Sequence, residues 1–224
     1  MKKYIVAPSI LTANFLELKS DLDKLKKAKI KWIHYDVMDY NFVPNLSFGP
    51  KILSDIVNNY DFKMDLHLMV KIVGFSVEDY LKPFIQKNVK QVTMHYEALN
   101  KKQLIDFIKF CKKNNINASL SINPNTEINK IKKYLPNLQN ILVMSVNPGF
   151  GGQSFIKKSL DKIRLLNEIR NTNNYQYLIQ VDGGINEDTY KSVQEAGVDM
   201  IVAGSYLVDS KIKNLEERIS KLEG

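Results

Sequence analysis

The sequence predicts one α/β domain, a single (β/α)8 barrel that covers residues 1–224, and three observations support this fold class. Short apolar segments alternate with longer segments in which apolar residues recur every three or four positions. The ends of successive apolar segments are about 28 residues apart, which is the length of one strand and one helix. No linker or shift in composition divides the chain, so its 224 residues suffice for one near-minimal barrel.

The apolar segments are expected to be the eight strands of this barrel. They cover residues 4–8, 32–37, 64–68, 91–95, 118–122, 141–146, 177–181 and 200–203. Amphipathic segments with helical spacing lie between them, at 18–28, 52–57, 104–111 and 156–166 among others. Their apolar positions are expected to cover the sheet from outside.

Local signals mark several boundaries of these elements. Ser76 precedes acidic residues and is expected to cap a helix, and Pro50 is expected in the first turn of another. Pro83 lies inside the helical pattern at 77–87 and predicts a kink or a late start of that helix.

The alternative fold, a doubly wound sheet, normally has a glycine-rich turn after its first strand, but residues 7–11 contain no glycine.

The composition argues against several classes of protein. A charged content of 25% with plentiful Ile, Leu and Val is not that of a disordered chain. We expect a cytoplasmic protein, because the sequence has neither a signal-peptide core nor an apolar span of about 20 residues. The net charge of +8 comes mostly from Lys spread along amphipathic segments, which favours solvated helix faces over a nucleic-acid interface. Cys111 lies in an apolar helical pattern and is expected to be a packing residue.

Polar side chains end three of the predicted strands, where a barrel places its chemistry. His34 and Asp36 share one face of their strand because they are two residues apart, while His67 and Asp182 end two other strands. Together they could hold one divalent ion, and this ligand set suits Zn, Mn, Fe(II) or Co. The alternative is that each His is a hydrogen-bonded core residue and each Asp a turn or capping residue.

Six of the ten glycines follow the last three predicted strands. They are Gly149, Gly151, Gly152, Gly183, Gly184 and Gly204. Barrel phosphate sites are built from loops near the seventh and eighth strands, where missing side chains let backbone N–H groups approach the anion. The glycines therefore favour a phosphate site over three unrelated tight turns.

Four further residues lie near strand ends without a role that spacing can assign. Three are Met38, Met69 and Met144, for which core packing is the ordinary role. The fourth is His95, which is expected in the layer that lines the pocket.

At these positions the sequence resembles the ribulose-phosphate 3-epimerase family. The resemblance runs in order through most of the chain, at residues 7–11 (APSIL), 34–39 (HYDVMD), 42–45 (FVPN), 65–70 (DLHLMV), 146–153 (VNPGFGGQ) and 181–185 (VDGGI). It implies a (β/α)8 metalloenzyme, an isomerase that interconverts D-ribulose 5-phosphate and D-xylulose 5-phosphate through an enediolate.

The resemblance also implies a role for each matching residue. Asp36 and Asp182 are the expected catalytic acid/base pair. One divalent metal ion per subunit is expected on His34, Asp36, His67 and Asp182. Substrate contacts are expected from Ser9, His67, Gly149, Phe150, Gly151, Gly152, Asp182, Gly183, Gly184, Gly204 and Ser205. Met38, Met69 and Met144 are expected to line the reacting carbons, and the family implies a homo-oligomer.

Two loops depart from the pattern of the family. Tyr40 follows Asp39 where the family usually has Gly, so this turn must be rebuilt or must tolerate a bulky residue. Residues 71–80 depart from a turn that usually contains Pro. Both loops are expected at the rim of the active-site face, where they bear on substrate preference and oligomer contacts.

Three other functions remain open from the sequence. A sister epimerase acting on a hexulose phosphate such as D-allulose 6-phosphate would use the same catalytic residues and differ at the rim loops. A phosphate-site lyase or decarboxylase would be expected to have a Lys where His67 stands. A basic nucleic-acid-binding protein without catalytic activity would need a basic and aromatic motif, which the sequence lacks.

Overall fold

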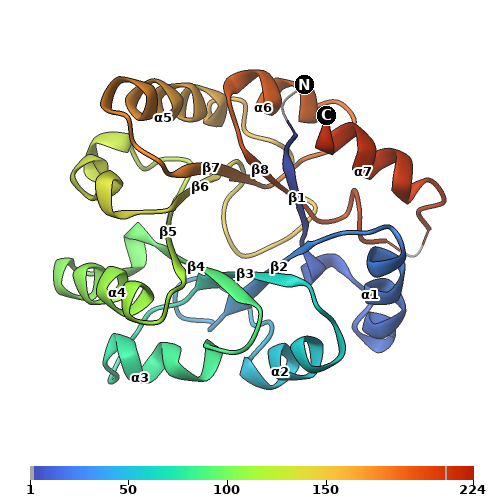
Figure 1. Cartoon of the computed structure of the whole chain (residues 1–224), viewed down its shortest axis with the longest axis horizontal. Coiled ribbons are helices and arrows are strands. Elements are labelled where there is room, and N and C mark those ends of the chain that lie inside the picture. The colour runs from blue at the N-terminus through green and yellow to red at the C-terminus, as the bar shows by residue number, and fades with distance from the viewer. Residues whose placement is uncertain (1–2, 210) are drawn as a thin grey trace.

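The computed structural model describes residues 3–209 and 211–224 and confirms the predicted (β/α)8 barrel (Figure 1). Its wall consists of eight strands. They are β1 (Ile5–Pro8), β2 (Trp32–Met38), β3 (Lys63–Met69), β4 (Val89–His95), β5 (Asn117–Ile122), β6 (Asn140–Met144), β7 (Leu178–Asp182) and β8 (Met200–Ala203). Each strand overlaps the segment predicted for it, and β6 ends two residues earlier than predicted.

The strands are parallel and follow the order β1-β8-β7-β6-β5-β4-β3-β2 around the barrel. Seven neighbouring pairs form ladders of several residues. Among the described residues, β1 and β2 are joined by one parallel bridge between Ser9 and His34. The barrel therefore closes at a narrow β1–β2 seam, and two residues of the predicted site form it.

Helices surround the barrel and cover its outer surface (Figure 1). In the described residues the α-helices are α1 (Leu18–Lys27), α2 (Pro50–Asn59), α3 (Val77–Leu81), α4 (Lys101–Lys113), α5 (Ser159–Asn173), α6 (Tyr190–Ala196) and α7 (Leu215–Glu223). The four amphipathic segments named from the sequence correspond to α1, α2, α4 and α5. Cys111 is fully buried on α4 beside Leu104 and Phe107, which confirms that it is a packing residue.

The connection between β5 and β6 differs from the others. Within its described residues 123–139 it forms two 3-10 helices, Ile128–Lys130 and Lys132–Asn137, and no α-helix. Pro136 lies in the second of them, where its missing N–H and its ring work against an α-helix. The regular spacing predicted eight similar units, and this unit keeps its strand but has a shorter covering element.

Alternation along the strands separates an apolar outer layer from a polar interior. On β2, Ile33 and Tyr35 belong to the large apolar core between strands and helices. Inside the barrel, Gln91 Nε2 donates to Oδ1 of Asp65 at 2.8 Å, and Gln180 Nε2 donates to Oδ2 of Asp65 at 2.5 Å. We call Asp65, Gln91 and Gln180 the interior polar network, and all three are essentially inaccessible to solvent.

The structure confirms the predicted helix boundaries at Ser76 and Pro50 and shows that the prediction for Pro83 is wrong. Ser76 Oγ accepts the backbone N–H of Asp79 at 3.0 Å and caps α3, as predicted, and Pro50 is the first residue of α2. Pro83 neither kinks a longer helix nor delays its start. Instead α3 ends at Leu81, and the proline lies in the 3-10 helix Lys82–Phe84 that follows.

The turn after β2 accommodates Tyr40 in a left-handed conformation with an exposed side chain. Tyr40 has φ of 57°, a left-handed conformation that glycine adopts at least cost, and its side chain is 68% exposed. The Asp39 carboxylate accepts the N–H groups of Asn41 and Phe42 and also that of Lys71, at 2.8 Å. The two loops that depart from the family pattern are therefore tied to each other through Asp39.

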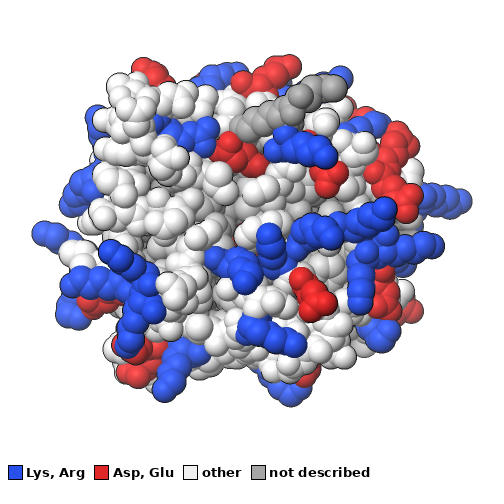
Figure 2. Space-filling model, viewed as in Figure 1, with Lys and Arg blue, Asp and Glu red and all other residues white. Residues whose placement is uncertain are grey.

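Charged side chains are mixed over the surface. Figure 2 shows Lys and Arg spread over the face in view, with Asp and Glu among them. Several Lys residues are paired with Asp one helical turn away, as in Lys19–Asp23 and Lys51–Asp55. This distribution agrees with solvated helix faces. None of the helices in the described part of the chain has the length and apolar content needed to cross a membrane.

Candidate active site

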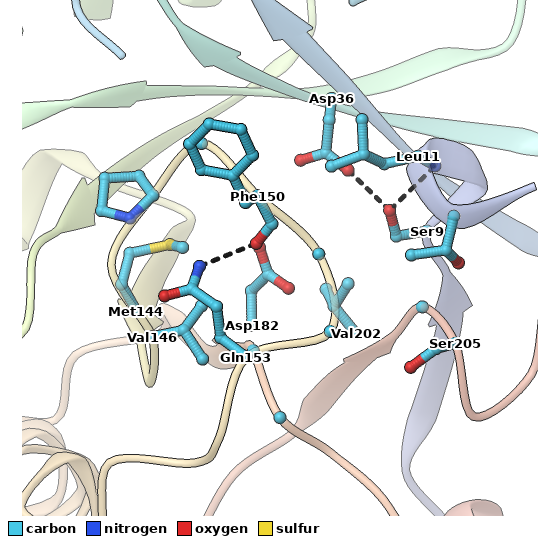
Figure 3. Close-up of a pocket in the computed structure, with 18 of the residues that line it drawn as sticks. Ser9, Leu11, Asp36, Met144, Val146, Phe150, Gln153, Asp182, Val202 and Ser205 are labelled. Atoms are coloured by element: carbon cyan, nitrogen blue, oxygen red, sulfur yellow. Dashed lines mark hydrogen bonds between the residues drawn. The ribbon is translucent and has the colours of Figure 1, made fainter. Parts of the chain in front are cut away.

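A pocket opens at the carboxyl ends of the strands, as the fold predicts (Figure 3). Its floor is formed by strand residues and its walls by the loops after β1, β6, β7 and β8. In Figure 3, Ser9 and Asp36 lie on one side of the pocket, and Met144 and Val146 lie on the other. The pocket therefore brings together segments that are far apart in the sequence.

The four predicted metal ligands meet at the floor of this pocket. Each of His34, Asp36, His67 and Asp182 offers one atom, and these atoms lie within 4.8 Å of one another. Nε2 of His34 is 3.2 Å from Nδ1 of His67, which in turn is 3.1 Å from Oδ1 of Asp36. Oδ2 of Asp182 is 3.7 Å from Nε2 of His34 and 3.6 Å from Nδ1 of His67.

This donor set fits one divalent metal ion. Imidazole nitrogens and carboxylate oxygens are ligands that Zn, Mn, Fe(II) and Co accept. When both rings are neutral, the facing nitrogens of His34 and His67 can each carry a lone pair, and a cation between them would be bound by both. Because the four atoms come from β2, β3 and β7, the ion would also connect strands on both sides of the β1–β2 seam.

Asp36 is held in its charged form. Burial of the side chain opposes ionisation, but the imidazoles of His34 and His67 outweigh it and hold the pKa of Asp36 well below its usual value. Ser9 Oγ also donates a hydrogen bond of 2.6 Å to Oδ2 of Asp36 across the β1–β2 seam. Three neighbours therefore stabilise the carboxylate.

Asp182 has the opposite tendency. Burial raises the pKa of Asp182 to about 7, His34 opposes this rise, and the negative charge of Asp36 adds to it. Its side chain is nevertheless 18% exposed and lines the pocket. Near neutral pH, Asp182 can therefore hold a proton that Asp36 does not hold.

His34 is supported from behind by the interior polar network. Its Nδ1 lies 2.7 Å from Oδ2 of Asp65. Burial favours the neutral ring, but the carboxylates of Asp36 and Asp65 outweigh it and hold the pKa of His34 well above its usual value. In the metal-free site His34 is therefore protonated between two carboxylates.

Glycine is required where the loops after β6 and β7 meet. Gly183 and Gly184 have φ of 118° and 65°. A Cβ on Gly183 would lie 2.4 Å from Cγ2 of Val146, and one on Gly184 would lie 2.6 Å from the backbone N of Phe155. The close approach of these two loops, which shapes one end of the pocket, therefore depends on the absence of both side chains.

The loop at residues 147–153, which we call loop 147–153, is held by two amide side chains. Gln153 Nε2 donates to the carbonyl oxygens of Asn147 and Phe150, at 2.7 and 2.8 Å (Figure 3 shows the second bond). Asn45 Nδ2 donates to the carbonyl oxygen of Gly149 at 2.8 Å. These bonds fold the loop over the pocket and connect it to the segment after β2.

The three methionines line the pocket beside the carboxylates. Met38 and Met69 pack with Val43, and Met144 packs with Val146. Their side chains are almost fully buried, so they present thioether surface and exclude water next to Asp36 and Asp182.

The predicted substrate-binding residues lie around the pocket as expected, with one difference. His67 does not line it but lies just beneath, with its ring fully buried and one nitrogen among the ligand atoms. His95 is not in the pocket lining either. It lies under Phe42, whose ring centroid is 4.8 Å away, and its Nε2 is 2.9 Å from Nε2 of His67.

The sequence did not single out several residues that line the pocket. They are Leu11, Thr12, Val146, Asn147, Pro148, Gln153, Ile185, Asn186 and Val202. Most lie within or directly beside the segments that carry the family resemblance, and their position after the ends of strands was the signal available. The role of Asp65 could also be sought from its spacing, because it is two residues before His67 and shares its face of β3.

Solved structures with the same architecture share little sequence with this chain. A mutant tryptophan synthase alpha-subunit from Pyrococcus furiosus matches with a TM-score of 0.71 and 16% identity, covering 99% of both chains. Orotidine 5'-monophosphate decarboxylase from Sulfolobus solfataricus matches with a TM-score of 0.66 and 13% identity, covering 99% of this chain and 96% of that one. These similarities support the barrel fold alone.

Curated relatives are much closer in sequence. Ribulose-phosphate 3-epimerase from Escherichia coli is 39% identical over 211 residues, covering 93% of this chain and 91% of the relative. The enzyme of the same name from Helicobacter pylori is 37% identical and covers 94% of this chain and 93% of the relative. The model of the ribulose-phosphate 3 epimerase family matches residues 5–208, a range that contains the ligand cluster and every loop of the pocket. With the fold, the site and the sequence in agreement, the chain belongs to the ribulose-phosphate 3-epimerase family.

Proposed function

We propose that this enzyme interconverts D-ribulose 5-phosphate and D-xylulose 5-phosphate by moving a proton at carbon 3. The observation that carries the proposal is the pair Asp36 and Asp182, which meet on the pocket floor with opposite proton affinities. Epimerisation needs a base that removes a carbon-bound proton and an acid that returns one to the opposite face. The two carboxylates come from β2 and β7 and can approach a substrate from two sides.

The proton affinities assign the first roles. Asp36 has the lower proton affinity and can act as the base that removes the proton from one face of carbon 3, while Asp182 has the higher proton affinity and is the member of the pair that can deliver a proton to the other face. The same pair acts with exchanged roles in the reverse reaction. Because the two groups interact, they titrate as a pair.

His34, Asp36, His67 and Asp182 would hold one divalent ion, and its identity among Zn, Fe(II), Mn and Co belongs to this proposal. When bound, such an ion supplies positive charge that stabilises the enediolate as negative charge develops on the substrate oxygens. Ser9 is proposed to contact both the substrate and Asp36, to which it donates its hydrogen bond.

The glycine-rich end of the pocket is proposed to bind the phosphate. This end contains Gly149, Phe150, Gly151, Gly152, Gly183, Gly184, Gly204 and Ser205. Backbone N–H groups there can approach an anion closely, because no Cβ stands in the way. Loop 147–153 would cover the bound sugar and Met38, Met69 and Met144 would keep water from the reacting carbons.

A homo-oligomer and a cytoplasmic location are also part of the proposal. Phe15, Leu16 and Leu46 are 54%, 95% and 66% exposed, and apolar surface of this kind supports contact with a second copy. The single described thiol, Cys111, is free and fully buried, which agrees with a reducing compartment.

The proposed reaction is tested by proton exchange in deuterated water. Ribulose 5-phosphate incubated with the enzyme should gain deuterium at carbon 3 and yield xylulose 5-phosphate, as read by proton NMR. Allulose 6-phosphate should react more slowly under the same conditions. Retention of the original hydrogen at carbon 3 during turnover, or no turnover of either sugar, would contradict the proposal.

A further inference from the structure

We infer that His95 and Glu97 are positioning residues that fix the orientation and tautomer of the His67 imidazole. They lie outside the pocket, and no step of the proposed reaction uses them. The inference rests on the proposed function in one respect, because it takes His67 as a metal ligand. Its test therefore measures metal binding and ring protonation, which do not depend on turnover.

The geometry connects the two ring nitrogens of His67 to different partners. Nδ1 faces the ligand cluster, 3.1 Å from Asp36 and 3.2 Å from His34. Nε2 points away from the cluster and lies 2.9 Å from Nε2 of His95. The two rings are nearly parallel, at an interplanar angle of 25°. His67 thus stands between the metal site and a second imidazole.

This arrangement leaves one consistent set of proton positions. A nitrogen that binds a metal carries no proton, so neutral His67 must carry its proton on Nε2 and donate it to His95. Nε2 of His95 must then accept, which places the proton of His95 on Nδ1. Nδ1 of His95 lies 3.4 Å from Oε2 of Glu97, a carboxylate that can accept that proton.

Glu97 is itself held in place at the other end of this chain. Its Oε1 accepts the backbone N–H of Asn123 at 2.8 Å and the hydroxyl of Thr126. Lys162 Nζ donates to the carbonyl oxygens of Asn123, Pro124 and Thr126, which secures the same turn. The carboxylate therefore has a fixed position from which to orient His95.

Burial prevents water from taking over these contacts. His67 and His95 are fully buried, and the ring of Phe42 packs against His95, with its centroid 4.8 Å away. His34 obtains the same kind of support more directly, because its Nδ1 meets Asp65 at 2.7 Å. Each imidazole ligand thus has a carboxylate behind it, and only His67 reaches its carboxylate through another ring.

The test measures Co²⁺ binding to the purified full chain after chelator treatment. His95→Phe keeps an aromatic ring but removes the acceptor, so the Co²⁺ dissociation constant should rise about 10- to 100-fold and the visible Co²⁺ spectrum should change. His95→Gln retains an amide oxygen as acceptor and should recover most of this loss. Glu97→Gln keeps the side-chain size and should weaken binding less than His95→Phe.

Thr93→Val is the matched control. Thr93 is on the same strand and fully buried, and its hydroxyl has no hydrogen-bond partner among the described residues. The substitution should leave Co²⁺ affinity and spectrum unchanged, which separates loss of the acceptor from general disturbance of the barrel. In addition, 15N NMR of the Zn²⁺-loaded wild-type protein should show the His95 proton on Nδ1.

The inference is overturned if His95→Phe binds Co²⁺ as the wild-type chain does, with the same spectrum, or if His95 carries its proton on Nε2. It is also overturned if the wild-type chain binds no Co²⁺. If His95→Phe does not fold, Glu97→Gln decides, and unchanged affinity in that variant counts against the inference. Ribulose 5-phosphate turnover is measured separately, so its absence would contradict the proposed function without affecting these results.

Discussion

Asp36 and Asp182 are chemically identical side chains whose surroundings give them opposite proton affinities. Asp36 has the imidazoles of His34 and His67 and the hydroxyl of Ser9 around it, and its pKa is held well below the usual value. Asp182 has no such set of close donors within the described residues, and burial raises its pKa to about 7. The positions of β1, β2 and β3 around each carboxylate therefore decide which one gives up its proton.

This difference suits a reaction that needs a base and an acid at once. Two carboxylates with equal pKa values near 4 would both be ionised at neutral pH, and neither could deliver a proton. Here the charge of Asp36 itself helps to keep the proton on Asp182. The two carboxylates therefore differ in proton affinity in the direction that a base and an acid require.

The largest effect is expected from removing either member of the pair. Asp36→Asn and Asp182→Asn should each lower kcat for ribulose 5-phosphate by about 1000-fold, because one proton transfer loses its group. Steady-state kinetics measures the loss, and circular dichroism serves as the control for folding. If either folded variant turns over at close to the wild-type rate, the two-carboxylate scheme is wrong.

The next effect concerns pH and metal binding. In the metal-free site His34 is protonated and Asp182 has a pKa of about 7, whereas both must be deprotonated to bind an ion. Metal affinity should therefore fall as the pH is lowered, about tenfold per unit above pH 7 and approaching a hundredfold per unit below it. Asp36 should contribute nothing to this slope because it is already ionised.

Calorimetric titration with Zn²⁺ in buffers of different protonation enthalpy counts the released protons directly. The count should approach about two at pH 6. A count that stays the same from pH 6 to pH 8 would show that Asp182 does not titrate in this range. It would contradict the difference in pKa between Asp36 and Asp182.

A smaller effect is expected from Ser9→Ala, which makes the surroundings of the two carboxylates more alike. Loss of the 2.6 Å hydrogen bond should raise the pKa of Asp36 and reduce kcat by about tenfold. The acidic limb of the kcat/KM profile should move to higher pH.

Ser121→Ala is the matched control, since that buried hydroxyl has no partner in the described residues and its loss should change kcat less than about twofold. Equal effects of the two substitutions would contradict this role of Ser9.

The smallest effect is expected at the rim, away from both carboxylates. Tyr40→Gly relieves a left-handed conformation, at φ of 57°, but increases the freedom of the unfolded chain. The net gain should be about 0.5 kcal/mol, or about 1–2 °C in the thermal midpoint, with kcat unchanged. A lower midpoint would mean that Tyr40 makes stabilising contacts that its 68% exposure does not suggest.

Much of this architecture could be predicted because it depends on local periodicity. Alternation placed His34 and Asp36 inside the barrel, and the strand ends gave Asp182 and the glycine loops their common location. The 3-10 connection after β5 could not be predicted from regular spacing, because it depends on the position of Pro136 within a short unit.

The relation between His67 and His95 depends on contacts that no spacing encodes. It requires the register of β3 against β4, the rotation of both rings and the cover provided by Phe42. The contrast between Asp36 and Asp182 likewise depends on burial and on neighbours from other strands. Sequence patterns predicted which residues would meet, and packing determined what each one does there.

The β1–β2 seam bears on the stability of the enzyme. Because one bridge, between Ser9 and His34, joins β1 to β2 in the described part of the chain, we expect these strands to separate more easily than the others and hydrogen exchange to be fastest there among the strands. An ion held by residues of β2, β3 and β7 would connect strands that lie on both sides of this seam. Loss of the proposed ion would then remove this connection together with the chemistry of the site, and the folded state would become less stable.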